Sequence, residues 1–512
     1  MKLHSILFGE MADSRITETE TAEVPDFFSD LILDQIIDAI TADKQEYHLK
    51  PFFYTPLHDI NLIRYRYEVM QDLADRNLFD CIKAFTSKMS CMREQLVQAD
   101  KLHYKYQKES WFLAAVEVYC EAVGCLVHDL SLVELKSRGF LAFRDYITEY
   151  YQSQIFTALL TETKQSKTDL SLVQYCMLIQ DNCIQVRKYA AETDYSAAVE
   201  KTFEKFRQGA GKNYQIQFSD YPEMNHVEEQ ILDFVAKLYP EIFSRFDNYC
   251  IVHDNYLDET LKIFDREIQF YIAYLEFIER FEQNGLKFCY PQVSSTGKEV
   301  CAYESFDLAL ANKLIGEKVR VVCNDFYLKG NERIFVVSGP NQGGKTTFAR
   351  TFGQLHYLAG IGCPVPGRKA QLFLFDKLFT HFEKAENIKN LRGKLQDDLV
   401  RIYDILNQAT ADSIIIMNEI FTSTTLKDAG FLGKQIMKRI VQLDALCVCV
   451  TFIDELTACS ENIVSLVSTV VPENPALRTY KIVRKSAGGR LYAVSLAEKY
   501  RLTYECLKER IQ

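Results

Sequence analysis

Residues 338–347 combine glycines, a lysine and two threonines at a spacing that suits phosphate binding. The segment reads Ser338-Gly-Pro-Asn-Gln-Gly-Gly-Lys-Thr-Thr347 and fits the pattern G-x-x-x-x-G-K-[ST]. Bare glycine backbone lets successive N–H groups point at phosphate oxygens, Lys345 reaches the outer phosphates as an exposed loop residue, and the Thr346 hydroxyl can bind Mg²⁺. The predicted nucleotide-binding residues are Gly339, Pro340, Asn341, Gln342, Gly343, Gly344, Lys345, Thr346 and Thr347.

The segments on either side of this loop are those that a phosphate-binding loop needs. The apolar run Ile334 to Val337 predicts a buried strand, and Phe348 to Leu358 predicts a helix. The positive end of that helix would point at a bound anion. A chance glycine turn before a helix is the alternative, and both flanks argue against it.

A second chemical feature lies at Asn418-Glu419, directly after the apolar run Ser413 to Met417. In nucleotide hydrolases the corresponding strand usually ends in Asp-Glu, where the Asp holds the water shell of the metal and the Glu polarises the attacking water. We therefore predict Glu419 as the catalytic base, Thr346 as a metal ligand and Asn418 as an indirect one through water. An amide offers the metal a dipole instead of a full charge, so we expect slow hydrolysis.

The rest of the C-terminal half alternates short apolar runs with helical segments. A third strand is predicted at Leu446 to Thr451, and a late hairpin at Arg478 to Arg484 with Arg490 to Ser495. This alternation indicates a mostly parallel sheet with helices on both faces and a ligand at the carboxyl ends of the strands.

The N-terminal half predicts long helices with very little strand character. The clearest helical stretches are Phe112 to Leu132, Leu170 to Tyr189, His226 to Tyr239 and Tyr256 to Phe281. Arg207 to Phe218 is read as a connector between helices. The expected organisation is a flexible lead-in (1–24), an all-α core or lever domain (25–287), an α/β P-loop ATPase domain of the ABC type (288–495) and a short helical tail (496–512).

Composition narrows the class of protein. The 512 residues carry a net charge of −11, so any nucleic-acid contact must come from a local basic patch. Fifteen scattered cysteines and nine dispersed histidines show no zinc-ligand spacing, which predicts reduced thiols, no zinc site and a cytoplasmic protein. No apolar run approaches the length of a membrane span, so no membrane partner is expected.

The last two hundred residues resemble the ATPase domain of the MutS family of DNA mismatch-repair proteins. The phosphate loop is similar to the family's T-G-P-N-M-G-G-K-S-T, including the unusual Pro-Asn pair. Thr422-Ser-Thr-Thr-Leu-Lys-Asp428 is similar to its G-T-S-x-x-D turn, and Val450-Thr-Phe-Ile-Asp-Glu-Leu-Thr457 to its A-T-H-x-x-E-L-T. A weaker resemblance, at Thr55 to Arg66, is to the start of the family's helical core.

The resemblance implies binding of ATP and Mg²⁺, a homodimer formed through the ATPase face and the closing helices, and binding of mismatched, branched or otherwise distorted DNA in DNA repair. Four residues fall at the family's trans-acting or switch positions: Gly393, Lys394, Asp428 and Phe452. Phe452 replaces the His expected to sense the γ-phosphate, and Val321 stands where an aromatic ring would stack on adenine. The chain carries no F-x-E wedge in a suitable place, so we expect recognition of DNA structure without insertion into a mispair.

Three functions remain open from the sequence. The first is a clampless MutS-like dimeric ATPase that binds distorted DNA. The second is a nucleotide-dependent conformational protein that acts through a protein partner without touching DNA. The third is a different head-type ATPase with long helices, which the Pro340-Asn341 pair and the absence of a long heptad repeat disfavour.

Overall fold

The computed structural model describes residues 5–9, 21–181, 183–191, 224–383, 393–471, 474–485 and 501–504, with the single residues 199, 202, 507 and 508. The chain forms two compact units. Unit 1 contains residues 1–71, 137–139 and 266–512, and unit 2 contains residues 72–136 and 140–265. This division differs from the linear boundary expected at residue 288, because the segment before residue 72 packs with the C-terminal half.

The N-terminal part of unit 1 consists of short helices: α2 (Phe28–Leu31), α3 (Leu33–Thr41), η1 (Gln45–Tyr47), α4 (Lys50–Tyr54) and α5 (Ile60–Asp72). Their aromatic residues reach residues far along the chain. Phe28 lies edge-on to Tyr357, with ring centroids 5.1 Å apart, and the Tyr357 hydroxyl donates to the Phe53 carbonyl at 2.6 Å. These contacts explain why residues from the two ends of the sequence form one unit.

A six-stranded sheet is the centre of unit 1. Its strands are β7 (Ile334–Ser338), β10 (Leu378–His381), β11 (Ile414–Asn418), β12 (Leu446–Val450), β13 (Ile463–Val471) and β14 (Asn474–Arg484). They lie in the order β10-β11-β12-β7-β13-β14, all parallel except β14, which is antiparallel to β13. The three predicted strands at residues 334, 413 and 446 are thereby confirmed.

The first half of the predicted late hairpin is found as a strand. Residues 478–484 belong to β14, whose neighbour is the preceding strand β13, with Leu466 opposite Arg484. Residues 490–495 lie outside the described part of the chain, so the pairing of residues 478–484 with residues 490–495 stays a prediction.

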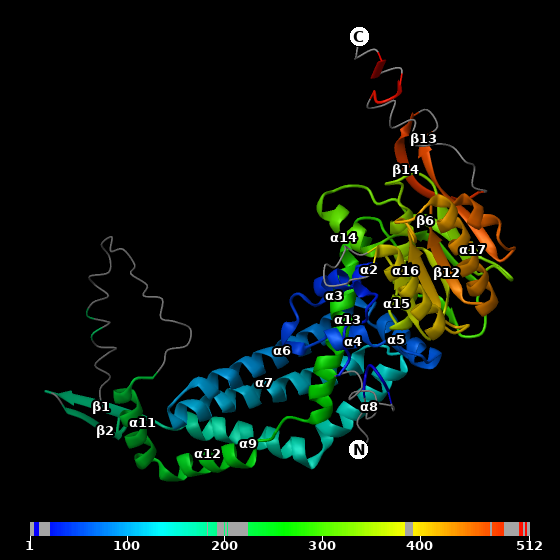
Figure 1. Cartoon of the computed structure of the whole chain (residues 1–512). Helices are drawn as coiled ribbons and strands as arrows, with labels where there is room; N and C mark the ends of the chain where they lie inside the picture. The colour runs from blue at the N-terminus through cyan, green and yellow to red at the C-terminus, as the bar shows by residue number, and fades with distance from the viewer. Residues whose placement is uncertain are drawn as a thin grey trace. The chain divides into compact units, whose positions relative to one another are not determined.

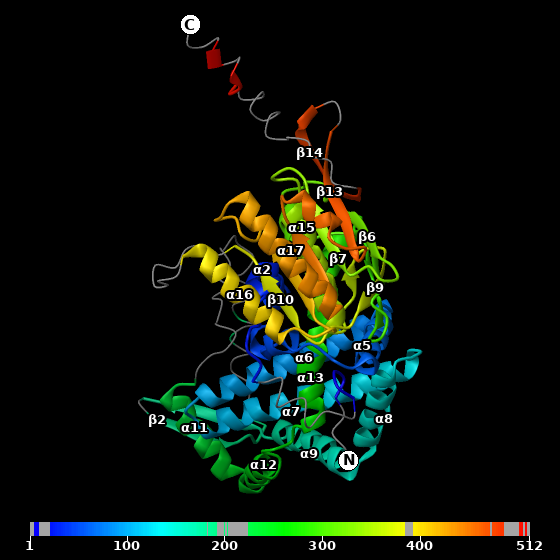
Figure 2. The ribbon, with the colours of Figure 1, turned by 45° about the vertical axis from the view of Figure 1, so that its right-hand side comes forward.

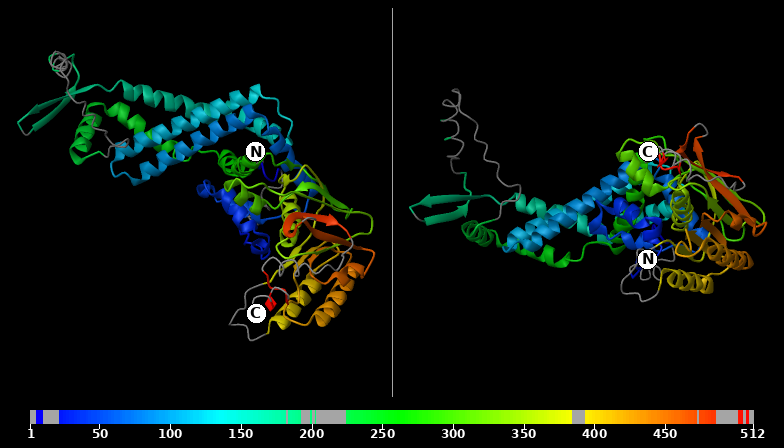
Figure 3. Two further views of the ribbon diagram at one scale, coloured as in Figure 1. Left: turned by 90° about the horizontal axis from the view of Figure 1, so that it is seen from above. Right: turned by 45° about the horizontal axis from the view of Figure 1, so that its top comes forward.

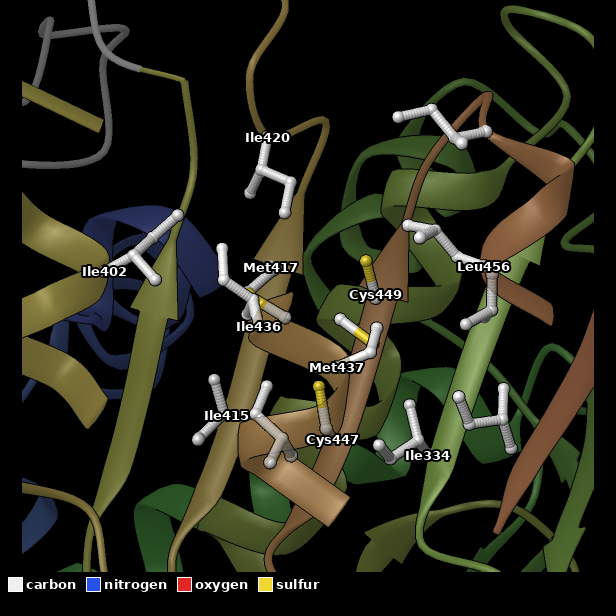
Figure 4. Close-up of a cluster of buried hydrophobic side chains, with 14 of the residues drawn as sticks. Ile334, Ile402, Ile415, Met417, Ile420, Ile436, Met437, Cys447, Cys449 and Leu456 are labelled. Carbon is white, nitrogen blue, oxygen red and sulfur yellow. The ribbon is translucent and has the colours of Figure 1, made fainter. Parts of the chain in front are cut away.

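Helices cover both faces of the sheet, as the alternation of strands and helices predicts. α15 (Lys345–Gly360) packs on one face, where Phe335 of β7 meets Phe348 and Phe352 at centroid distances of 5.9 and 6.0 Å. α16 (Lys394–Gln408) and α17 (Leu426–Leu443) cover the other face (Figure 2). Ile334 points to that second face because side chains alternate along a strand. Figure 4 shows this core, with Ile334, Ile415, Met417, Cys447 and Cys449 of the strands against Ile436 and Met437 of α17.

Smaller elements complete unit 1. A four-stranded sheet has the order β4 (Gln292–Ser294), β9 (Lys369–Phe373), β5 (Val300–Ser305) and β6 (Asn324–Leu328). A two-stranded sheet pairs β3 (Phe288–Cys289) with β8 (Val365–Pro366), and the remaining helices are α14 (Leu308–Gly316) and η2 (Asp454–Ala458).

Long helices form most of unit 2 (Figure 1). Their bounds are α6 (Arg76–Lys101), α7 (Lys105–Leu132), α8 (Arg138–Gln152), α9 (Gln154–Ser171), α11 (His226–Leu238), α12 (Pro240–Val252) and α13 (Glu259–Glu282), the first residues of α8 and the later part of α13 belonging to unit 1. Asp75 caps α6 by accepting from the Asn77 N–H at 2.8 Å, and Phe143 stacks on Phe264 with ring centroids 3.5 Å apart.

The expectation of an all-α region over residues 25–287 is wrong at one place. The predicted helix from Leu170 to Tyr189 ends at Ser171, and the antiparallel strands β1 (Tyr175–Gln180) and β2 (Cys183–Lys188) follow it. Asp181 adopts a positive φ of 53° between them, a turn conformation that a helix cannot contain. The connector predicted at residues 207–218 lies outside the described residues.

The predicted flexible lead-in also contains an ordered, buried element. Residues 5–9 form a turn closed by a bridge between Ser5 and Gly9, and Ile6, Leu7 and Phe8 are at most 2% exposed. The Ser5 hydroxyl donates to the fully buried Glu267 carboxylate, at 2.8 Å from its nearer oxygen. These partners lie far along the chain, so the sequence near residue 5 gives no sign of them.

α7 is the one described helix that is long and apolar enough to cross a membrane, judged by length and composition. Its residues Val116, Tyr119 and Val123 are fully buried where α7 packs against other helices of unit 2. The central helix of a helical bundle meets the same criterion.

Candidate functional site

The predicted phosphate loop is a turn between the central strand β7 and the start of α15. Gly344 precedes the helix with φ 91°, a left-handed conformation that favours glycine. The first N–H groups of a helix have no partner within the helix, so at this end they are free to bind an anion. The strand, loop and helix predicted from the sequence are thus confirmed as local structure.

Lys345 is buried, contrary to the expectation of an exposed loop lysine. It is 4% exposed, and its Nζ donates to the carbonyls of Gly339 and Pro340, both at 3.1 Å, and to Asn341 Oδ1 at 3.2 Å. The helix begins at Lys345 itself, which turns the side chain back under the loop. The ammonium group therefore binds the loop from the inside.

The two chemical features of the sequence meet at the carboxyl ends of β7 and β11, two parallel strands with β12 between them. The Thr346 hydroxyl donates to Asn418 Oδ1 at 2.9 Å, and Lys345 Nζ lies 4.0 Å from Glu419 Oε1. Glu419 has a positive φ of 54°, and its N–H donates to the Val450 carbonyl at 2.9 Å. The strained backbone directs the carboxylate toward the loop at the point where the sheet ends.

A cavity of about 500 Å³ opens on the loop, within the size range of small-ligand sites. It is lined by Leu310, Asn341, Gln342, Gly343, Gly344, Lys345, Thr346, Thr347, Glu419 and Tyr480. The sequence analysis missed Leu310 and Tyr480. Leu310 lies in the first turn of α14, and Tyr480 reaches the loop only because β14 pairs with β13, which no local pattern reveals.

Positive charge gathers at this cavity. Burial lowers the pKa of Lys345, the Glu419 carboxylate opposes that shift, and the neighbouring Arg478 guanidinium adds to it. A bound anion would offset both the burial cost and the repulsion between these two cations. Backbone N–H groups and two cations fit a polyphosphate, and the oxygens of Thr346, Asn418 and Glu419 are the ligand type that Mg²⁺ prefers.

The predicted trans-acting or switch residues are absent from the described lining of the cavity. Gly393 precedes α16, and Lys394 pairs with Glu383. Asp428 accepts from the Thr425 hydroxyl at 2.8 Å in the cap of α17, and Phe452 is 46% exposed after β12. Their roles therefore stay predictions.

Comparison with known proteins points to the same part of the chain. Residues 335–510 match the family described as MutS domain V. The DNA mismatch repair protein MutS of Orientia tsutsugamushi (strain Boryong) is 30% identical over 219 residues, which cover 41% of this chain and 24% of that protein. The Endonuclease MutS2 of Gemmatimonas aurantiaca is 27% identical over 185 residues, which cover 36% and 22%.

The similarity thus spans about a quarter of the length of these relatives. The matched residues include most of β7, the phosphate loop, the strand ending at Asn418 and the β13–β14 pair. The resemblance to the MutS family seen in the sequence motifs is confirmed over these residues, which are similar to domain V of that family.

Proposed function

We propose that residues 288–495 form an ABC-type P-loop ATPase domain that binds ATP and Mg²⁺ at residues 339–347 and hydrolyses ATP slowly. The observation that carries this proposal is that the loop and Glu419 line one cavity at the edge of a parallel sheet, where Asn418 accepts a hydrogen bond from Thr346. Ligands bind at this edge in open α/β sheets. The match of residues 335–510 to MutS domain V supports the assignment.

When ATP binds, phosphate oxygens replace the loop oxygens as hydrogen-bond acceptors of Lys345, and they are the stronger acceptors. Lys345 Nζ now donates to two uncharged carbonyls and an amide oxygen. Phosphate oxygens carry charge, and charge-assisted hydrogen bonds are roughly twice as strong as neutral ones. The lysine moves onto the outer phosphates, and the backbone N–H groups of the loop and of the first turn of α15 surround the inner ones. Leu310 and Tyr480 offer an apolar side chain and an exposed ring to the base.

Hydrolysis requires an oriented water and compensation of the charge that develops on the phosphates. Glu419 is the base that orients and deprotonates the water. Mg²⁺, when bound, supplies the charge compensation. Thr346 and Asn418, which share a hydrogen bond, would hold the metal, Thr346 directly and Asn418 through water, but Asn418 would contribute no charge. We therefore infer tight ATP binding with slow turnover.

The partners proposed for this ATPase are DNA and a second copy of the chain. The relatives' names supply the DNA part, since one is a DNA mismatch repair protein and another an endonuclease of the MutS2 type. We propose that the chain recognises distorted DNA by its structure and that the ATPase face and the tail at residues 496–512 form the homodimer. The conformation of the helical unit would then depend on whether ATP is bound.

A protein partner without DNA contact is the second candidate function, and the β1–β2 hairpin favours it. The hairpin exposes large apolar side chains, with Ile179 74% and Met177 48% exposed, and Ile184 39%. Exposed apolar clusters are typical of protein-binding surfaces, whereas phosphate contacts need cations.

A salt-titrated binding assay separates the two candidates. Branched duplex DNA is mixed with the ATP-loaded protein at increasing salt, with a linear duplex of the same length as the control. Recognition of DNA structure predicts a preference for the branched duplex and a steep loss of affinity with salt, because phosphate contacts release counterions. Absence of binding to either duplex would remove the DNA function and leave the protein-partner function standing. Equal binding of both duplexes would remove the recognition of DNA structure.

A further inference from the structure

The strand pair β13–β14 contacts the phosphate loop and also reaches the cavity through Tyr480. It forms the edge of the six-stranded sheet and is coloured orange in Figure 3. Ser468 of β13 is fully buried, and its hydroxyl donates to the Gly343 carbonyl at 2.6 Å. Arg478 of β14 donates through Nε to the Asn341 carbonyl at 3.2 Å. Both contacts hold backbone atoms of the loop.

The Ser468 bond fixes the orientation of a neighbouring N–H group. The carbonyl of Gly343 and the N–H of Gly344 belong to one planar trans peptide and point in opposite directions. Holding the carbonyl on β13 therefore turns the Gly344 N–H away from that strand. Gly344 lines the cavity, so its N–H group is a hydrogen-bond donor for a phosphate oxygen there. Ser468 therefore orients this N–H group without contacting the phosphate itself.

The loop lies so close to Ser468 that there is no space for a side chain between them. A Cβ added at Gly343 would come 2.2 Å from Ser468 Oγ, and one added at Gly339 would come 3.0 Å from the Ser468 backbone N and O atoms. Both ends of the loop thus rest on the same residue of β13. This close approach is a physical reason for glycine at both positions.

Arg478 acts on the other side of the loop. Its charge lies near enough to Lys345 to contribute to the lowered pKa of that lysine. A polyphosphate would relieve the repulsion between the two cations. Arg478 thereby favours binding of an anion at the loop.

The strand pair is itself fixed, so it can serve as a support. Asn324 of β6 donates to the Tyr480 carbonyl at 3.1 Å and accepts from the Ile482 N–H at 2.8 Å. The hydroxyls of Thr469 and Thr479 bond each other across the pair at 2.5 Å. Movement of β14 would therefore be transmitted to the loop through Ser468 and Arg478.

We propose that Ser468 and Arg478 are positioning residues that hold the phosphate loop in its anion-binding conformation, and that this is how the strand pair controls nucleotide affinity. The inference rests on the proposed binding of ATP at this loop. It concerns the phosphate half of the ligand, because both residues hold loop backbone and neither lines the cavity.

The first test compares Ser468→Ala with Ser465→Ala in the full chain. Ser465 lies on the same strand, and its hydroxyl has no hydrogen-bond partner among the described residues, so its loss is a matched control. Affinities for ATP, inorganic pyrophosphate and adenosine are measured by competition with a fluorescent ATP analogue. Loss of one buried hydrogen bond predicts about tenfold weaker binding of ATP and pyrophosphate by Ser468→Ala. The affinity of Ser468→Ala for adenosine should stay within about twofold of the wild-type value. The affinities of Ser465→Ala for all three ligands should stay within the same limit.

The role of Arg478 is tested with variants that remove or keep its positive charge. Arg478→Gln should weaken ATP and pyrophosphate binding, most strongly at low salt, and Arg478→Lys should restore most of it because the cation remains. An unchanged pyrophosphate affinity in Ser468→Ala, or an equal loss for adenosine, would overturn the positioning role while wild-type ATP binding upholds the proposed function. A wild-type chain that binds no ATP would overturn both.

Discussion

The phosphate loop and the N-terminal turn at residues 5–9 are both short irregular segments held in place by distant side chains, yet only the loop was visible in the sequence. The loop carries its chemistry in ten consecutive residues between a strand and a helix. The turn has no motif, and its partners are Tyr65, Arg66, Glu267 and Tyr271. A binding function depends on local residue types, whereas burial depends on complementarity between segments that are far apart.

The two segments also differ in what their hydrogen bonds do. In the turn, the Tyr271 hydroxyl donates to the Ile6 carbonyl at 2.8 Å and Arg66 Nε donates to the Leu7 carbonyl at 3.3 Å, and all of these groups are buried. In the loop, Lys345 holds acceptors that a ligand can replace. We therefore expect changes in the loop to alter function with little effect on stability, and changes in the turn to do the reverse.

The largest functional effect is expected for Gly343→Ala. The new methyl group would come 2.2 Å from Ser468 Oγ and 2.9 Å from the Pro340 carbonyl, so the loop must move. Overpacking of this kind costs about 1–3 kcal/mol, and ATP binding should weaken by about 100-fold. Gly316→Ala is the control, because a Cβ there meets nothing within 4 Å among the described residues. Equal ATP affinities of the two variants in a fluorescence titration would contradict the close contact.

Asn418→Asp tests how residues beside the same loop would hold Mg²⁺. Restoring a carboxylate beside Thr346 should raise turnover by about tenfold to a thousandfold, equivalent to roughly 1.4 to 4 kcal/mol of barrier, and lower the Mg²⁺ concentration needed. Glu419→Ala should remove the remaining turnover without releasing ATP. Steady-state phosphate release across a Mg²⁺ titration measures both variants. No change in rate or Mg²⁺ midpoint for Asn418→Asp would show that the amide does not limit hydrolysis.

Glu267 makes the turn sensitive to pH. Burial raises its pKa from 4.5 to about 7, although hydrogen bonds from Ser5 and the turn backbone oppose the shift. The folded state therefore binds more protons than the unfolded state between these values, and the free energy of unfolding falls as pH rises from about 4.5 to 7. Burial of His356 lowers its pKa to about 4 and contributes with the opposite sign between about 4 and 6.5.

Glu267→Gln separates the contribution of the Glu267 carboxyl to the pH dependence of the unfolding free energy from that of His356. Relative to this variant, the wild-type protein should lose roughly 1 to 3 kcal/mol of unfolding free energy between pH 5 and 7. Denaturant unfolding at several pH values measures the difference. Parallel pH profiles of the two proteins would mean that Glu267 is already ionised in the folded state.

The smallest effect is expected for Ser5→Ala. The Ser5 hydroxyl donates to Glu267 and accepts from the Phe8 N–H at 2.8 Å, and its loss should cost about 1 to 2 kcal/mol. ATP affinity should be unchanged, since none of these atoms lines the cavity. Thermal unfolding with and without ATP checks both statements. A loss of ATP affinity without a loss of stability would contradict the statement that the turn stabilises the fold whereas the loop binds the ligand.

The same contrast explains how much of the molecule could be predicted. The strands ending at Ser338 and Asn418 and the helix after the loop follow from apolar runs with turn residues at their ends. Ser468 and Tyr480 reach the loop through strand pairing, which leaves no local signal. The helix predicted over the run Tyr175 to Ile179 is a strand in the structure, because consecutive apolar residues carry no clear period.

Equilibrium binding of ATP to the wild-type chain and to Lys345→Ala tests the central claim most directly. Calorimetric titrations with and without Mg²⁺ would be run on both proteins, with thermal unfolding as the check that the variant, which loses a buried side chain, remains folded. We predict one ATP per wild-type chain and a loss of about 100-fold or more in the variant, because Lys345 supplies the cation at the outer phosphates. Equal ATP affinity in the two folded proteins, or no binding by the wild type, would contradict a nucleotide site at residues 339–347.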